Sequence, residues 1–175
     1  MTDINLKPAE DPSWGEPDAD GAVVELIELL FFAYRDFVSE PDKILTDYGF
    51  GRAHHRVVHF VGRHPGICVA ELLDILRITK QSLGRVLRQL IDTGHICQVA
   101  GESDRRQRRL FLTRKGEELH ERLIAPQAAR VRAAIAAAGP GGGAASRDML
   151  FRLVDAADRG HVLALLDRAT MRKAV

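Results

Sequence analysis

The segment Lys80–Asp92 places apolar and polar residues on opposite faces of a helix. Its apolar residues recur at the i, i+3, i+4, i+7 and i+8 spacing that predicts an amphipathic helix. Thr79 is a favourable N-cap, and Gly94 lies where a left-handed residue commonly ends a helix. One face is therefore expected to pack on a core while the other stays exposed. The inner face is Leu83, Val86, Leu87, Leu90 and Ile91, and the outer face is Lys80, Gln81, Arg85, Arg88 and Gln89.

The neighbouring segments predict a short helix before this one and a β-hairpin after it. Val69–Leu76 has an apolar face, and a tight turn separates it from the helix that Thr79 begins. Residues 95–99 and 109–112 are β-like stretches, and the connection between them is rich in arginine. Two helices followed by a basic hairpin are typical of a winged helix-turn-helix. In that fold the second helix fits the DNA major groove, and the hairpin reaches phosphates or the minor groove.

Charge is unevenly distributed along the 175 residues, although the formal net charge is only +1. Residues 1–50 carry a net charge of −9, residues 51–115 carry +8, and residues 116–175 carry +2. No acidic residue lies between Asp104 and Glu117, whereas four arginines lie within 105–109. A basic middle third between acidic and nearly neutral arms indicates that the winged helix-turn-helix faces a polyanion.

An apolar helix is predicted near the N-terminus. In residues 22–37, apolar side chains recur at intervals of three and four residues, which predicts an amphipathic helix. Its apolar area is larger than an isolated surface helix needs, so we expect a partner chain to cover it. Residues 1–21 are too acidic and too rich in proline and glycine to order alone. Pro41 and residues 47–49 are expected to break the helical pattern before a second helix over 52–61.

The sequence of the C-terminal third also predicts helices. The expected elements are a long helix capped by Thr113 and running to about residue 135, a stop at the glycine run 139–143, and helices over 147–154 and, with Asp155 as N-cap, over 156–171. The fold class is therefore mainly α with a small β-hairpin wing. Its expected divisions are a disordered acidic arm (1–21), an N-terminal dimerisation helix (22–45), a winged helix-turn-helix DNA-binding domain (46–115) and C-terminal dimerisation helices (116–175).

The chain is similar to the MarR (multiple antibiotic resistance) family of regulators over about residues 22–123, and more loosely beyond. The resemblance is carried by VAELL at 69–73, TKQSLGRVLRQL at 79–90, Gly94, and DRR at 104–106 leading to LFLTRKG at 110–116. It implies a homodimeric transcriptional regulator, more often a repressor than an activator, on a roughly palindromic DNA operator. It also implies that Asp104 holds the wing arginine Arg106.

Two features depart from the family pattern. Arg77 occupies a turn position that often holds a small residue, and the glycine run 139–143 interrupts the C-terminal helices. The first bears on the geometry of the turn, and the second on the geometry of the C-terminal dimer helices. The residues expected to contact DNA are Thr79, Lys80, Gln81, Ser82, Arg85, Arg88, Gln89, Asp104, Arg105, Arg106 and Arg108.

The resemblance further implies a pocket beside the second helix for a small aromatic or phenolic effector. The expected pocket residues are Phe31, Tyr34, His54, His55, Arg56 and His59. His55 and His59 are four residues apart and could also face one metal ion, with Asp36 or Glu40 arriving from elsewhere. Because no cysteine or carboxylate completes a ligand set within that helix, we expect no metal and no cofactor, and metal sensing is kept as an alternative.

Cys68 and Cys97 raise a second alternative, a redox-sensing regulator. Relatives that sense peroxide usually carry the cysteine near the first helix, where this chain has none. Two cysteines are also too few for a disulfide framework. A small apolar side chain is the simpler explanation at both positions.

Other functions are less well supported. No glycine-rich phosphate loop follows a strand, and no nucleophile–base set has a supporting motif, so an enzyme is not expected. A winged-helix module that binds an acidic protein instead of DNA stays an alternative, and salt dependence with duplex competition would distinguish it. No signal peptide and no apolar run of about 20 residues is present, so we expect a cytoplasmic protein without membrane contact.

Overall fold

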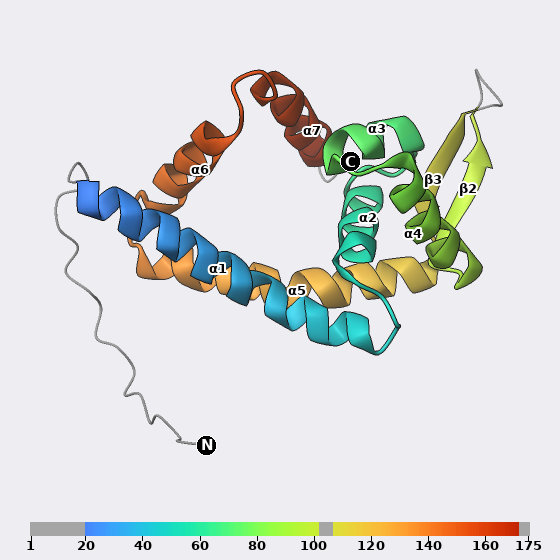
Figure 1. Ribbon diagram of the computed structural model, residues 1–175, viewed down its shortest axis with the longest axis horizontal. Coiled ribbons are helices and arrows are strands. Elements are labelled where there is room, and N and C mark those ends of the chain that lie inside the picture. Colours follow the sequence, from blue (N-terminus) through green and yellow to red (C-terminus); the bar gives the residue numbers. More distant parts are fainter. Residues whose placement is uncertain (1–19, 102–106, 172–175) are drawn as a thin grey trace. The chain divides into compact units, whose positions relative to one another are not determined.

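The computed structural model of the chain describes residues 20–101 and 107–171 (Figure 1). The expected acidic arm therefore lies almost wholly outside the described residues. The elements, in chain order, are α1 (Asp20–Thr46), α2 (Arg52–Arg63), β1 (Ile67–Cys68), α3 (Val69–Leu76), α4 (Lys80–Asp92), β2 (Ile96–Ala100), β3 (Arg108–Leu112), α5 (Arg114–Ala137), α6 (Gly142–Leu153) and α7 (Arg159–Met171).

The chain divides into two compact units, residues 1–37 and 38–175, and the boundary falls inside α1. The expected helix break at Pro41 was wrong, because α1 continues through it to Thr46. Pro41 has no amide hydrogen to donate to the carbonyl of Phe37, so the helix lacks one bond close to the boundary between the units. Burial offsets that loss, since Val38, Pro41 and Leu45 are all buried.

The core of the second unit lies under the helix-turn-helix and the hairpin. It is built from the apolar faces of α2, α3 and α4 together with β3 and the first half of α5. The predicted inner face of α4 is confirmed for Leu83, Val86, Leu87 and Leu90, which are buried, while Ile91 packs partly buried against them. This packing determines which face of α4 is left for solvent or a partner.

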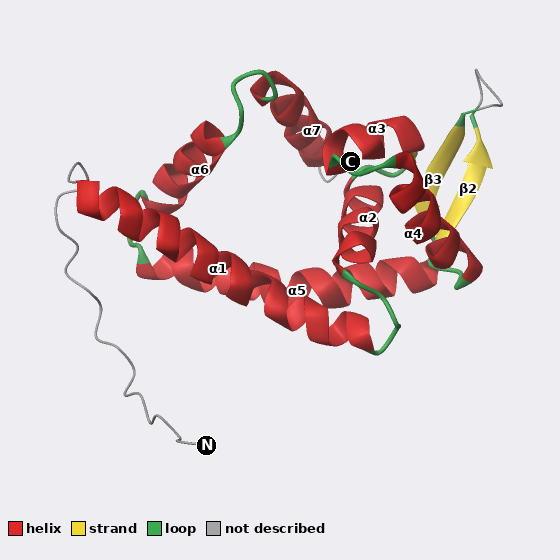
Figure 2. Ribbon diagram, viewed as in Figure 1, coloured by secondary structure: helices red, strands yellow, loops and turns green. Residues whose placement is uncertain are grey.

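A small antiparallel sheet forms the wing, with strand order β1-β3-β2. β2 and β3 pair from Ile96 opposite Leu112 to Ala100 opposite Arg108. Figure 2 shows this ribbon extending past α4. The short strand β1 was not expected from the sequence; it pairs Ile67 with Leu110 and fixes the base of the wing to the start of α3.

The C-terminal helices differ from the expected boundaries. α6 begins at Gly142, inside the glycine run, because Gly141 supplies a left-handed N-cap with φ +85°. A Cβ on Gly142 would lie 2.5 Å from the Cβ of Ala138, so the turn between α5 and α6 needs glycine there. The expected N-cap at Asp155 was also wrong: α7 starts at Arg159, and the carbonyl of Asp158 accepts the first helical bond from Val162.

Candidate nucleic-acid interface

The outer face of α4 is exposed and basic. Lys80, Gln81, Ser82, Arg85 and Arg88 are all exposed, opposite the buried face that holds the helix on the core. Within residues 20–101 and 107–171, no carboxylate lies within ion-pair distance of the three cations on this face. These cations are therefore available to an anionic partner, and they occupy one side of a helix narrow enough for a major groove.

Thr79 and Ser82 form the N-terminal cap of α4. The Thr79 hydroxyl oxygen accepts a hydrogen bond from the Ser82 amide at 3.1 Å, and the two hydroxyl oxygens are 2.9 Å apart. The predicted cap is thus confirmed. The partial positive charge of the helix N-terminus lies at this exposed end, where it favours an anion such as a phosphate.

Gln89 does not share the exposed face of α4. Its side chain is half-buried against α2, where Oε1 lies 2.9 Å from Nε2 of His54. The amide of Gly51 donates to Nδ1 of His54 at 3.1 Å, so Nε2 carries the ring proton and donates it to Gln89. The Gln89 Nε2 donates in turn to the carbonyl of Gly49 at 3.3 Å. Both side chains thus tie α4 to α2 and the loop before it.

The described part of the wing ends at a pair of residues joined by a backbone hydrogen bond. The amide of Gly101 donates to the carbonyl of Gln107 at 2.9 Å, which continues the β2–β3 ladder toward the tip. Arg108 is exposed, whereas Arg109 is half-buried and donates to the carbonyl of Gly66 at 3.1 Å. The predicted contacts of Asp104, Arg105 and Arg106 lie outside the described residues.

Residues after the wing attach it to the C-terminal end of α4. The hydroxyl of Thr113 donates to the carbonyl of Gly94 at 2.6 Å, and Nζ of Lys115 donates to the carbonyl of Thr93 at 2.9 Å. Gly116 lies at the same junction, and a Cβ at this position would lie 2.0 Å from the carbonyl oxygen of His95. This explains physically why a glycine follows the Thr-Arg-Lys segment. The sequence interpretation missed this role of Lys115.

His95 lies buried at the same junction and was not singled out from the sequence. Its Nδ1 is 2.9 Å from the hydroxyl of Thr93, and its ring packs edge-on against Tyr48 and Phe50. Burial, together with the positive charge of Lys115, lowers the pKa of His95 below its ordinary value. A neutral imidazole therefore fills the space between the wing, α4 and the loop before α2.

Comparison with known proteins identifies this arrangement. Residues 48–107, which span α2 through the first wing strand β2, match the sequence pattern of the MarR family. The HTH-type transcriptional regulator PetP of Rhodobacter capsulatus is 48% identical over 141 residues, which cover 81% of this chain and 85% of PetP. The chain belongs to the MarR family. The predicted fold class and the predicted function as a transcriptional regulator are both confirmed.

Solved structures of MarR-family and related regulators share the fold. FabT of Streptococcus pneumoniae, solved in complex with DNA, aligns with a TM-score of 0.66 and 21% identity over 75% of this chain and 94% of FabT. The MarR-family protein Rv2887 of Mycobacterium tuberculosis, solved with p-aminosalicylic acid, aligns with a TM-score of 0.53 and 25% identity, over 74% of this chain and 98% of that protein.

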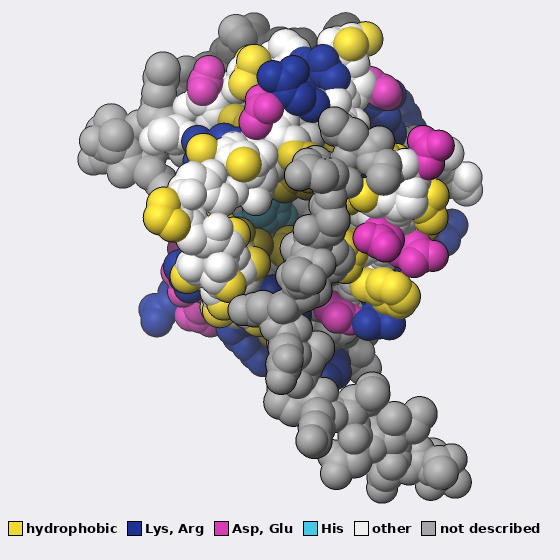
Figure 3. Space-filling model, turned by 90° about the vertical axis from the view of Figure 1, so that its left-hand side faces the viewer, with side chains coloured by type: hydrophobic (Ala, Val, Ile, Leu, Met, Phe, Trp, Pro, Cys, Tyr) yellow, Lys and Arg dark blue, Asp and Glu magenta, His cyan; other side chains and the backbone are white. Residues whose placement is uncertain are grey.

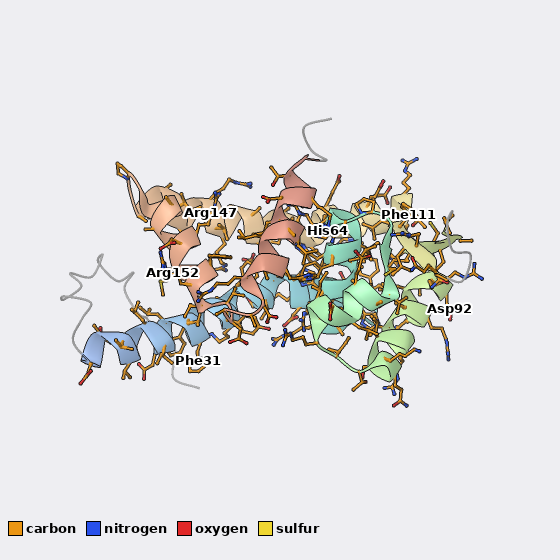
Figure 4. The ribbon with its side chains drawn as sticks, turned by 90° about the horizontal axis from the view of Figure 1, so that it is seen from above. Phe31, His64, Asp92, Phe111, Arg147 and Arg152 are labelled. Atoms are coloured by element: carbon orange, nitrogen blue, oxygen red, sulfur yellow. The ribbon has the colours of Figure 1, made fainter. Side chains whose placement is uncertain are left out.

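The residues expected to bind an effector fall in different parts of this MarR-family chain. Phe31, labelled in Figure 4, and Tyr34 belong to the first unit and are 69% and 56% exposed. His54 is bonded to α4 as described above. The guanidinium of Arg56 donates to the carbonyl of Leu76 at 3.1 Å, where it caps the end of α3. His54 and Arg56 are therefore occupied by contacts within the second unit.

His55 and His59 face α5 from α2. Burial lowers the pKa of His55, although nearby Asp42 opposes the shift. Burial, together with the neighbouring His120, lowers the pKa of His59 to about 4. Both rings are therefore neutral near pH 7. No group of three or more histidine, cysteine or acidic side chains is arranged to hold a metal ion within the part of the chain that the structure describes.

A cavity of about 400 Å³ lies between α7 and the helices α2 and α3. Figure 4 shows His64, one of its lining residues, close to α7. The wall combines apolar side chains such as Phe60 and Leu165 with the polar groups of His59 and Arg63. Such a mixture suits a small molecule that has an apolar body and a polar end. His59 is the expected effector residue that lines this cavity.

The remaining expectations concern the cysteines and the membrane. Cys68 and Cys97 are both free thiols, the first half-buried at the start of α3 and the second exposed on β2. None of the helices that the structure describes combines the length and apolar character of a membrane span.

Proposed function

We propose that this MarR-family regulator binds a specific duplex DNA sequence, with α4 in the major groove and the wing against the phosphate backbone or the minor groove. The observation that carries the proposal is the set of three exposed cations on one face of α4, which have no carboxylate partner among the described residues, beside a hairpin that exposes Arg108. Arg85 suits two-point contact with guanine, and Gln81 suits adenine. Thr79 and Ser82 suit a phosphate at the helix N-terminus.

Selection from a pool of randomised duplexes tests this proposal. The protein should enrich one roughly palindromic sequence and bind it at least a hundredfold more tightly than a scrambled duplex at about physiological salt. Equal affinity for the enriched and scrambled duplexes would instead favour a winged-helix module that binds proteins. So would displacement of the DNA by an acidic protein whose charge equals that of the duplex.

We infer that the regulator is a homodimer. Apolar side chains are exposed along the described start of α1, including Leu26, Ile27, Leu30 and Phe31, and also on α6. Figure 3 shows hydrophobic side chains, in yellow, among the exposed atoms. A second copy would cover such surfaces, and its two-fold symmetry would produce a palindromic site. Light scattering at micromolar concentration should give twice the 19.4 kDa of one chain, and the mass of a single chain would contradict the inference.

We infer further that a small aromatic or phenolic acid lowers the affinity for DNA, as expected of a ligand-responsive repressor. The cavity beside His59 supports this, as does the p-aminosalicylic acid in the structure of Rv2887. Salicylate should weaken DNA binding, by no more than its difference in affinity between the two states. Replacing His55 and His59 together by alanine should abolish the response and leave binding without salicylate unchanged.

The remaining parts of the proposal follow from this role. A regulator of this kind works in the cytoplasm, where its DNA is, and needs no catalytic group or cofactor. We propose that it represses transcription, because a dimer seated on an operator obstructs the polymerase. Transcription from a template carrying the enriched sequence should fall as the protein is added and recover with salicylate. Increased transcription would identify an activator.

A further inference from the structure

The C-terminal helix α7 contacts the end of α3, at the turn that leads to α4. Arg77 follows α3 directly and has a left-handed backbone, with φ +49°, which is uncommon for a residue that is not glycine. Its guanidinium donates to both carboxylate oxygens of Asp158 at 2.6 Å. Asp158 immediately precedes α7. The turn of the helix-turn-helix is thus bonded to a residue 81 positions further along the chain.

α7 also contacts the start of α3. One carboxylate oxygen of Glu71 accepts the amide of Cys68 at 2.9 Å, which caps the helix, and the other accepts the guanidinium of Arg168 at 3.1 Å. Burial alone would raise the pKa of Glu71, but these hydrogen bonds lower it below its ordinary value. Glu71 is therefore charged near neutral pH and joins α7 to the N-terminal cap of α3.

Apolar side chains lie beside the two ion pairs. Leu165 and Ala169 of α7 are only 7% and 3% exposed, and they line the cavity together with Ile75 of α3. Figure 1 shows α7, in dark red, lying against α3, in green. Each ion pair is partly exposed and weak by itself. Together they join the eight-residue helix α3 to α7 at both of its ends.

We propose that α7 is a clamp on α3, and that Asp158 and Arg168 are positioning residues for DNA recognition. The clamp, defined as the pairs Arg77–Asp158 and Glu71–Arg168, sets the orientation of α3 and of the turn from which α4 departs. Neither Asp158 nor Arg168 needs to touch DNA for this effect. The proposal rests on the proposed function, since it assigns to α7 the placement of the helix that reads the duplex.

A variant that makes the same change of charge away from α3 provides the control for this proposal. Asp158→Asn removes one negative charge, which by itself should tighten binding to a polyanion. Asp148→Asn removes the same charge from α6, where Asp148 pairs with Arg152 at 2.7 Å within a single helix. If α7 positions α3, Asp158→Asn should bind the enriched duplex at least fivefold more weakly, whereas Asp148→Asn should bind equally or more tightly. Asp158→Glu keeps the pair and should restore affinity to within twofold.

A second pair of variants and a second measurement separate positioning from folding. Arg168→Gln should weaken binding more than Arg152→Gln, which makes the same charge change in α6. Amide hydrogen exchange in α3 and at residues 77–79 should be faster in Asp158→Asn and unchanged in Asp148→Asn. The ratio of affinities for the enriched and scrambled duplexes should fall in the clamp variants, an effect that simple loss of folded protein does not produce.

Two outcomes would overturn the clamp. Equal affinity and equal exchange in Asp158→Asn and Asp148→Asn would overturn it while leaving DNA binding intact. Failure of the unaltered protein to enrich any duplex would overturn the proposed function together with the clamp that rests on it.

Discussion

The side chain of His54 donates to that of Gln89 across α2 and α4, with 2.9 Å between Nε2 and Oε1. This contact turns a glutamine of α4 away from the exposed face of that helix. Replacing Gln89 by alanine should lower the free energy of unfolding by about 1–2 kcal/mol, because the half-buried His54 loses its acceptor. Base preference should not change at any position. Urea denaturation and a second selection from the duplex pool measure the two effects.

Gln81 is the matched control for that substitution, since it is exposed on the same helix. Gln81→Ala should leave the free energy of unfolding within about 0.5 kcal/mol and relax base preference at one position of each half-site. The reverse pattern, with reduced specificity in the Gln89 variant and reduced stability in the Gln81 variant, would mean that Gln89 leaves His54 when DNA binds.

Gly116 is expected to be the least replaceable of the described glycines near the wing. A Cβ there would lie 2.0 Å from the carbonyl oxygen of His95, and that oxygen is held by the amide of Thr113 at 3.0 Å. Gly116→Ala should therefore destabilise the fold by at least about 2 kcal/mol. Gly84→Ala in the open middle of α4 should instead stabilise it by about 1 kcal/mol. Thermal unfolding of both variants compares them directly.

Stability should depend on pH through His59. Its pKa is lowered from 6.5 to about 4 in the folded protein, so below pH 6.5 the unfolded chain binds a proton that the folded chain excludes. The free energy of unfolding should therefore fall as pH decreases from about 6.5 to 4, by up to about 3 kcal/mol from this group. The lowered pKa of His55 adds to the fall. In His59→Gln, denaturation at pH 7 and at pH 5 should give a smaller difference; an unchanged difference would exclude His59 as the cause.

Local chemistry made much of the interface predictable from the sequence. Thr79 has a hydroxyl at the right distance before an amphipathic repeat, and the repeat alone orients Arg85 outward. Gln89 was misjudged as an outer residue because it lies at the edge of that face, and only its contact with His54, 35 positions earlier, decides its direction. Sequence spacing does not encode such long-range contacts.

The C-terminal helices were the least predictable part of the fold. Their boundaries depend on Gly141, whose left-handed conformation starts α6 inside a run that reads as a stop. Two ion pairs, Arg77–Asp158 and Glu71–Arg168, join α7 to α3, and no helical repeat signals those partners. The helix through Pro41 was misjudged for a related reason, since burial outweighs the missing bond.

The wing should contribute affinity more than specificity. Arg108→Ala should weaken binding to the enriched and scrambled duplexes by similar factors, and the slope of log affinity against log salt should flatten by about one unit for each phosphate that the variant no longer binds. The same is predicted for Arg105. Arg106 is expected to favour A·T-rich flanks, whose narrow minor groove attracts an arginine. Titrations at several salt concentrations, with Gln107→Ala as the neutral control, measure these slopes.

The central claim is that the exposed face of α4 reads base sequence, and titration of Arg85→Ala on two duplexes tests it most directly. The variant should lose roughly 1–3 kcal/mol on the enriched duplex and much less on the scrambled one, with relaxed preference at one position of each half-site. Arg114→Ala removes the same charge from the exposed start of α5 and should lose little on either. The assignment would be contradicted if Arg85→Ala lost equal affinity for both duplexes while Arg108→Ala lost affinity for the enriched duplex alone. That result would mean that the wing determines sequence specificity.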